Sequence, residues 1–114
     1  GRLIAAFAVT TGADKNYERG IDGAWMRDGS PYAVLRWACV ERDARRRGVG
    51  MFMIDKALTL SRAAGCATLR CDIHPANDAM RGLLEKQEFT RCGTVEVRDA
   101  LGRVKRRAAF EREV

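Results

Sequence analysis

The feature that most constrains the fold of this chain is one helical segment set between two strand-like segments. From Val49 to Ala64 the apolar residues recur at helical spacing, on a stripe made of Val49, Met53, Ala57, Leu60 and Ala64, widened by Ile54 and Leu58. Gly65 follows, where a left-handed helix cap favours glycine. The flanking segments Tyr32–Val40 and Ala67–Ile73 have the apolar or alternating patterns of strands. Strands that alternate with helices predict an α/β layer.

The rest of the chain fits the same plan. Arg2–Thr10 is an apolar run that predicts a strand, and Thr11–Ser30, with four glycines and no sustained period, predicts mainly loop. Asp78–Gln87 has an apolar helical side and a good start signal before it. Arg91–Arg98 and Arg103–Glu111 are strand-like, and the Asp-Ala-Leu-Gly segment between them indicates a hairpin.

Length and composition favour one globular domain spanning residues 1–114. Hydrophobic residues make up 46% of the chain and charged residues 32%, which excludes a disordered protein. No apolar run approaches the roughly 18 residues of a membrane span, and no signal peptide is visible. We therefore expect a cytoplasmic protein that does not bind membranes.

The cysteines are spaced widely and irregularly, without a CxxC pair. With His74 as the single histidine, no four-ligand zinc pattern can be assembled, so no metal is expected. We expect free thiols in a reducing compartment, three of them in apolar strand-like runs. The four thiols are Cys39, Cys66, Cys71 and Cys92.

A formal net charge of +6, almost all of it from excess arginine, suits a partner that carries negative charge. Nucleic acid, an anionic membrane and a phosphate-bearing cofactor are the candidates. Nucleic acid is disfavoured because the basic runs lack interleaved aromatic residues for stacking on bases. The run at 105–107 is expected to be a solvated surface, whereas the run at 45–47 precedes two glycines and a helix.

That junction, Arg45-Arg46-Arg47-Gly48-Val49-Gly50, has the chemistry of an anion site. The glycines permit a tight turn and leave backbone N–H groups uncovered, and the helix adds its free N–H groups and positive dipole end. Neither a dinucleotide GxGxxG nor a P-loop pattern is present. The junction therefore predicts a pyrophosphate site of another kind.

Two segments resemble the signatures of the GNAT N-acetyltransferase superfamily. Residues 40–50 are similar to the acetyl-CoA signature [Q/R]xxGx[G/A] after a strand that ends in valine. Residues 77–89 are similar to the second signature, NxxAxxLYEKxGF, and both lie in the right order with a helix and a strand between them. The resemblance implies a mixed, mostly antiparallel central sheet flanked by helices, with acetyl-CoA held in a splay between Tyr32–Val40 and Ala67–Ile73.

The resemblance also implies residue roles. Backbone N–H groups from Arg46 to Gly50, Val49 included, would hold the pyrophosphate, with Arg45, Arg46 and Arg47 beside it. The strand end formed by Ala38, Cys39 and Val40 would bind the pantetheine arm and polarise the thioester carbonyl. Asn77 would contact the cofactor, although a plain N-cap explains it equally well.

Three departures from the family pattern stand out. The usual first strand and two helices are missing, so the chain is shortened or truncated, or another subunit completes the acceptor site, which favours a homodimer. Leu84 replaces the tyrosine that often protonates the departing thiolate. Glu88 stands where glycine usually precedes Phe89, and this affects the turn.

Two residues are candidates for acid–base work on the acceptor amine. In Ala67–Ile73 the apolar side chains face one side, while Asp72 and His74 share the polar side with Arg70. Asp72 matches a glutamate base of some relatives, and His74 has the intrinsic pKa that suits proton transfer. Asp72 could instead attract the amine's charge or simply pair with Arg70, and His74 could be an exposed loop residue. Cys39 has apolar neighbours, which indicates a core thiol rather than a nucleophile.

The function expected from the sequence is transfer of the acetyl group of acetyl-CoA to an amine by direct attack. The acceptor is open: a polyamine, an antibiotic, an amino acid or a protein terminus would all fit. A non-catalytic acyl-CoA-binding or interaction module is the alternative, favoured by the missing elements and the missing tyrosine.

Overall fold

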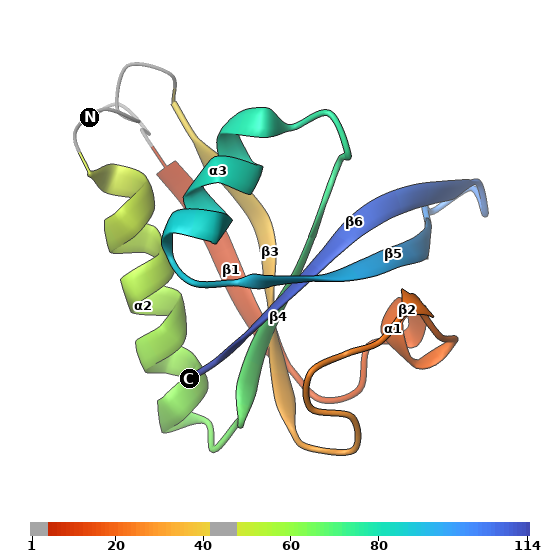
Figure 1. The fold of residues 1–114 in the computed structure, drawn as a ribbon, viewed down its shortest axis with the longest axis horizontal. Coiled ribbons are helices and arrows are strands. Elements are labelled where there is room, and N and C mark those ends of the chain that lie inside the picture. The colour runs from red at the N-terminus through yellow and green to blue at the C-terminus, as the bar shows by residue number, and fades with distance from the viewer. Residues whose placement is uncertain (1–4, 42–47) are drawn as a thin grey trace.

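The structure, a computed structural model, describes residues 5–41 and 48–114. Figure 1 shows its elements in chain order. They are β1 (Ala5–Thr11), α1 (Lys15–Glu18), β2 (Asp22–Gly23), β3 (Tyr32–Val40), α2 (Val49–Ala63), β4 (Thr68–Ile73), α3 (Asp78–Lys86), β5 (Thr90–Arg98) and β6 (Val104–Glu113). The longer elements follow the sequence prediction closely. The segment predicted to be mainly loop also contains the one-turn α1 and the two-residue β2.

The described strands form one mixed sheet in the order β1-β3-β4-β6-β5-β2. Every neighbouring pair is antiparallel except β3 and β4, which are parallel and joined through α2. The predicted mixed, mostly antiparallel sheet is confirmed. Among the described residues, no helix is both long and apolar enough to cross a membrane.

The parallel pair separates along its length, which confirms the predicted splay. β3 and β4 are in register only at Tyr32–Thr68, Ala33–Leu69 and Val34–Arg70. Beyond Val34, β3 continues beside β1 alone, and β4 continues beside β6. The two strands therefore diverge toward the end of the sheet where α2 begins and α3 lies (Figure 1).

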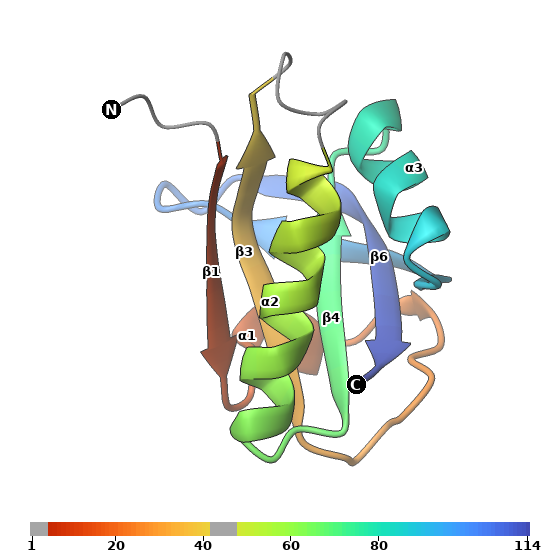
Figure 2. The ribbon, with the colours of Figure 1, turned by 90° about the vertical axis from the view of Figure 1, so that its left-hand side faces the viewer.

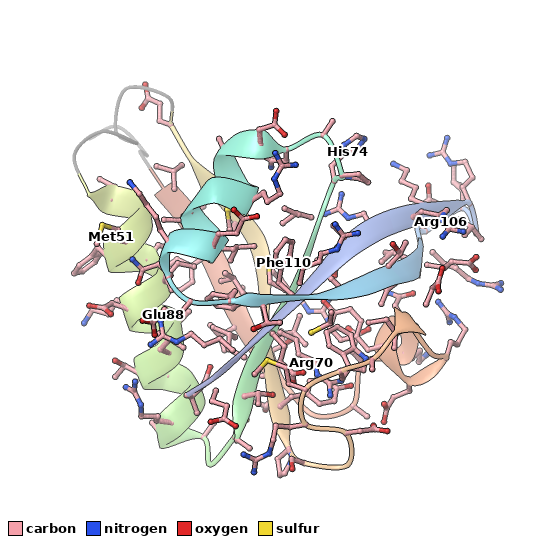
Figure 3. The ribbon with its side chains drawn as sticks, viewed as in Figure 1. Met51, Arg70, His74, Glu88, Arg106 and Phe110 are labelled. Carbon is pink, nitrogen blue, oxygen red and sulfur yellow. The ribbon has the colours of Figure 1, made fainter. Side chains whose placement is uncertain are left out.

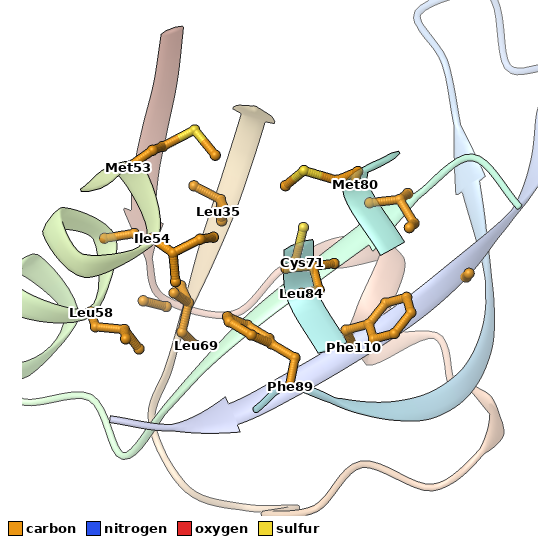
Figure 4. Packing of buried hydrophobic residues seen from close by; sticks show 14 of the residues in the cluster. Leu35, Met53, Ile54, Leu58, Leu69, Cys71, Met80, Leu84, Phe89 and Phe110 are labelled. Carbon is orange, nitrogen blue, oxygen red and sulfur yellow. The ribbon is translucent and has the colours of Figure 1, made fainter. Parts of the chain in front are cut away.

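The main core lies between the sheet and α2 and α3 (Figure 2). Figure 4 shows side chains from both helices meeting those of β3, β4 and β6. The predicted stripe is confirmed at Met53, Ile54, Ala57 and Leu58, which are buried. It is wrong at Leu60, which is exposed, and it missed Ser61, which is buried. The side chains labelled in this core are Leu35, Met53, Ile54, Leu58, Leu69, Cys71, Met80, Leu84, Phe89 and Phe110.

A second, smaller cluster covers the opposite face of the sheet. It consists of Tyr17, Tyr32, Val34, Val95 and Ala109, with Ile21, Trp25 and Val97 packed against it. The cover comes from α1 and the segment that follows it. The face of β4 predicted to be polar is therefore not a solvent face.

Arg70 shows the consequence of this cover. Its side chain is only 2% exposed, and its guanidinium carbon lies 4.1 Å from the ring centre of Trp25 and 3.8 Å from that of Tyr32. Its Nε donates to Glu111 Oε2 at 3.0 Å. Figure 3 shows Arg70 inside the molecule. The alternative pairing of Arg70 with Asp72 is therefore wrong, because Arg70 forms its ion pair with Glu111 from β6.

Both long helices end in the same hydrogen-bonded cap. At the end of α3, Glu88 N–H donates to Glu85 O at 3.1 Å and Phe89 N–H donates to Leu84 O at 2.9 Å, a Schellman motif. Glu88 has φ of 66°, in the left-handed region that favours glycine. The turn that glycine usually makes is therefore kept, and the glutamate adopts the backbone conformation that favours glycine.

The end of α2 repeats the motif with the preferred residue. Gly65 N–H donates to Arg62 O and Cys66 N–H donates to Ser61 O, both at 3.0 Å. Gly65 has φ of 79°, and no atom lies within 4 Å of where its Cβ would stand. The chain thus contains the same cap twice, once with glycine and once with glutamate.

Candidate functional site

A cavity of about 730 Å³ lies at the splayed end of the sheet. It is formed by the end of β3, the start of α2 and the first two turns of α3. The residues predicted to bind a cofactor that line it are Ala38, Cys39, Val40, Gly48, Gly50 and Asn77. Segments far apart in the sequence thus meet at one cavity, as the splay prediction requires.

The N-terminus of α2 opens onto this cavity. Gly48 is the N-cap, with φ of 77°, and as a glycine it has no side chain that could cap the helix. Among the residues that the structure describes, none has an atom within 4 Å of where a Cβ at Gly48 would stand. The first-turn N–H groups of an α-helix have no acceptor within the helix, and the dipole makes that end positive. This end of α2 is therefore suited to bind an anion.

The second glycine of the junction lines the cavity and also has a packing role that the sequence did not indicate. A Cβ on Gly50 would lie 2.9 Å from Leu83 Cδ2, so glycine here permits the close approach of α2 to α3. Val49 is half-buried against the main core rather than part of the cavity lining. Arg45, Arg46 and Arg47 lie outside the described residues.

Asn77 carries the N-cap of α3. Its Oδ1 accepts a hydrogen bond from Met80 N–H at 3.1 Å, and the side chain is exposed at the cavity. The N-cap interpretation is confirmed. Asn77 therefore both caps α3 and lines the cavity.

Two side chains near the cavity differ from expectation. Cys39 is exposed and lines the cavity, so its assignment as a core thiol is wrong. The reason is that the end of β3 projects past the ladder with β4, which leaves its last residues facing the opening. Leu84, at the position of the family's tyrosine, is completely buried in the main core, while its neighbour Leu83 faces the cavity.

Asp72 lies on the other face of β4, away from the cavity lining. Its Oδ2 accepts from the Tyr17 hydroxyl at 2.5 Å, and its Oδ1 accepts from Arg107 Nε at 3.0 Å. Burial and, after it, the charge of Asp72 raise the pKa of Tyr17 well above its usual value. The phenol therefore stays protonated and donates to the largely enclosed side chain of Asp72.

His74 follows the end of β4 and is exposed (Figure 3). Its Nδ1 accepts from Ala76 N–H at 3.0 Å. In the neutral ring this geometry places the proton on Nε2. Asp72 thus lies in β4 and His74 just beyond its end, and only Asp72 is joined to other side chains by the bonds described above.

The residues around Asp72 were missed by the sequence prediction. Tyr17 lies in the segment expected to be loop, and Arg107 lies in a basic run expected to be a solvated surface. A local signal exists for the first of these. Asp14 is a good N-cap type, and it does cap α1 by accepting from Asn16 N–H at 2.9 Å and Tyr17 N–H at 3.2 Å.

The splayed sheet and its cavity agree with what a comparison of sequences finds. A family model described as "Acetyltransferase (GNAT) family" matches residues 4–89, which is most of the chain. This chain belongs to the GNAT family. The resemblance seen in residues 40–50 and 77–89 is therefore confirmed. None of the curated proteins compared matches the chain.

Solved structures with the same fold include several GNAT proteins. A GNAT acetyltransferase from Streptococcus agalactiae is 24% identical with a TM-score of 0.71, over 98% of this chain and 60% of that one. Ribosomal-protein-alanine N-acetyltransferase from Brucella melitensis is 18% identical with a TM-score of 0.66, over 100% and 64%. Arabidopsis thaliana NAA60 in complex with acetyl-CoA is 13% identical with a TM-score of 0.66, over 96% and 64%. The chain thus spans about three fifths of the length of these proteins.

Proposed function

We propose that this GNAT chain transfers the acetyl group of acetyl-CoA to an amine by direct attack on the thioester. The observation that carries the proposal is the 730 Å³ cavity at the splayed end of the sheet, which is lined by Gly48, the N-cap residue of α2. A family match over most of the chain supports the same activity.

The described residues around the cavity fit acetyl-CoA. The N–H groups of the first turn of α2, beginning at Gly48, would bind the pyrophosphate, together with Arg45, Arg46 and Arg47 from the segment before it. Past Val34, β3 is not in a ladder with β4, and alternate backbone groups of a strand point toward such a gap. Those groups, near Ala38 and Cys39, would bind the pantetheine arm.

The amine must lose a proton before it can attack, and the geometry assigns different tasks to the two candidates. Asp72 already accepts hydrogen bonds from Arg107 and Tyr17, and a carboxyl group held in this way suits attraction of a protonated amine more than removal of its proton. His74, with Nδ1 bonded to Ala76, offers Nε2–H as a donor unless its ring turns. We therefore assign Asp72 to substrate binding, and His74 or a water chain to proton transfer.

One observation favours a second candidate function, a non-catalytic acyl-CoA-binding module. Leu84 occupies the position of the family's tyrosine and is completely buried, so this position supplies no acid to the thiolate. We also include a homodimer in the proposal, since β1 lies at the edge of the described sheet, where a strand of a second copy would be able to pair with it. Sedimentation equilibrium would measure the oligomeric state directly.

Calorimetric titration with CoA tests the cofactor assignment. Gly48→Val should weaken binding by about tenfold or more, because a branched side chain would stand among the first-turn N–H groups. Gly12→Val is the matched control, since Gly12 also has a positive φ (89°) and open space around its Cβ but does not line the cavity. Equal CoA affinity in the two folded variants would contradict the site.

A further inference from the structure

A network of hydrogen bonds connects β3 and β4 across the splay, on the face of the sheet opposite the cofactor cavity. On the β3 side, Arg36 donates to Asp14 Oδ2 and, from Nε at 2.9 Å, to Thr10 Oγ1. On the β4 side, Tyr17 donates to Asp72, which also accepts from Arg107 of β6. Asp14 and Tyr17 are joined in turn, because Asp14 caps the backbone of Tyr17.

These contacts begin where the backbone ladder ends. Val34 and Arg70 are the last residues of β3 and β4 in register. Arg36 and Asp72 each lie two residues further along, on the same face as Val34 and Arg70 respectively, because side chains alternate along a strand. The side-chain network therefore joins the two strands over the length in which no backbone ladder does.

The residues that bridge the gap are held firmly. The side chain of Asp14 is 5% exposed, and its backbone N–H donates to the Tyr32 hydroxyl at 2.8 Å. The ring of Tyr17 packs at 5.0 Å from that of Trp25 and 6.2 Å from that of Tyr32. A helix of four residues has no stability of its own, so these contacts must fix α1 in place.

We propose that Asp14 and Tyr17 are positioning residues that set the width of the splay between β3 and β4 and thereby the affinity for acetyl-CoA. For its ligand this inference rests on the proposed function. The physical reason is that a cofactor inserted between two diverging strands binds best when their spacing is fixed before it arrives. Without this network, the end of β3 has a neighbouring strand in the sheet on one side only, β1, and the end of β4 likewise has only β6.

The test compares two variants, each of which lacks one hydroxyl group that bonds near one end of β4. Tyr17→Phe deletes the bond to Asp72 and keeps the ring. Thr68→Val is the matched control. Thr68 is also buried, and its hydroxyl also donates to a carboxylate, Glu111 Oε2 at 2.6 Å. It lies, however, at the end of β4 where β3 and β4 remain paired. Each folded variant is titrated with CoA and its free energy of unfolding is measured.

Strand spacing is measured separately, without ligand. Spin labels on Cys39 and on His74→Cys, in a Cys92→Ser background, report the distance between the ends of β3 and β4 by electron spin resonance. We expect Tyr17→Phe to broaden this distance distribution and to weaken CoA binding roughly tenfold. Thr68→Val should leave both unchanged, even where it lowers the free energy of unfolding as much.

The outcomes separate the two proposals. A parent protein that does not bind CoA would overturn the proposed function, whatever the spacing shows. With CoA binding intact in the parent, an unchanged distance distribution in Tyr17→Phe would overturn the positioning role. Altered spacing with unchanged CoA affinity would overturn it too, as would equal losses of affinity in Tyr17→Phe and Thr68→Val.

Discussion

Replacing Glu88 by glycine should stabilise this protein. Glu88 holds the left-handed position of the cap that ends α3, a conformation that is unfavourable by about 1–2 kcal/mol for residues with a Cβ. Glycine removes that strain but has more freedom in the unfolded chain, which offsets about 0.4–1 kcal/mol. The net gain is about 0.5–1 kcal/mol in the free energy of unfolding, equivalent to a rise in Tm of about 2–5 °C.

The same cap at the end of α2 supplies the reciprocal experiment. Gly65→Gln should destabilise the protein by about 0.5–1 kcal/mol or more, since open space around its Cβ excludes a clash as the cause. Glu88→Gln serves as the charge control, because a negative charge near a helix C-terminus is itself unfavourable by about 0.3–1 kcal/mol. Urea denaturation followed by circular dichroism measures all three variants.

A specific result would refute this reasoning. If Glu88→Gln stabilised the protein as much as Glu88→Gly, charge rather than backbone conformation would be the cause. If Glu88→Gly lowered the free energy of unfolding, the glutamate side chain would have a stabilising role that the cap geometry does not explain.

Two further predictions follow from the site. In a Cys92→Ser background, Cys39 at the cavity should react with a thiol reagent in the folded protein and be protected by CoA, and Cys39→Ser should abolish this fast phase. Cys71, whose pKa burial raises to about 12, should react only on unfolding, and its fast labelling would contradict its burial. Asp72→Asn should raise KM for the amine severalfold with kcat largely retained, because it removes a charge that binds the substrate. A loss confined to kcat would instead indicate that Asp72 acts as a base.

The sequence contained enough to predict the framework that positions the cavity. Tyr32–Val40 was predicted with the bounds that the structure shows, because an apolar strand between a proline and a polar segment has few alternatives. The signature at 77–89 placed Asn77 at a helix start, and the structure confirms its capping bond. These features depend on local sequence patterns, namely the spacing of apolar residues, helix-capping residues and turn residues.

Other features depend on contacts that no local pattern encodes. Arg70 appears in an alternating strand whose polar side would face solvent, yet aromatic rings from distant segments bury it and Glu111 pairs with it. Tyr17 lies in a glycine-rich segment without period, and its place beside Asp72 depends on how that segment folds back over the sheet. Gly50 was predicted only as part of the anion site, and the close approach of Leu83 to it is a helix-packing constraint that only the tertiary structure reveals.

Acetyl transfer itself is the most direct test of the central claim. Release of CoA from acetyl-CoA should be measured over a panel of polyamines, aminoglycoside antibiotics, amino acids and peptides with free N-termini. Gly48→Val and Gly12→Val serve as the matched pair. The account predicts turnover with at least one amine above the rate of thioester hydrolysis, retained in Gly12→Val and lost in Gly48→Val. Binding of CoA without turnover of any amine would contradict it and favour the non-catalytic acyl-CoA-binding module.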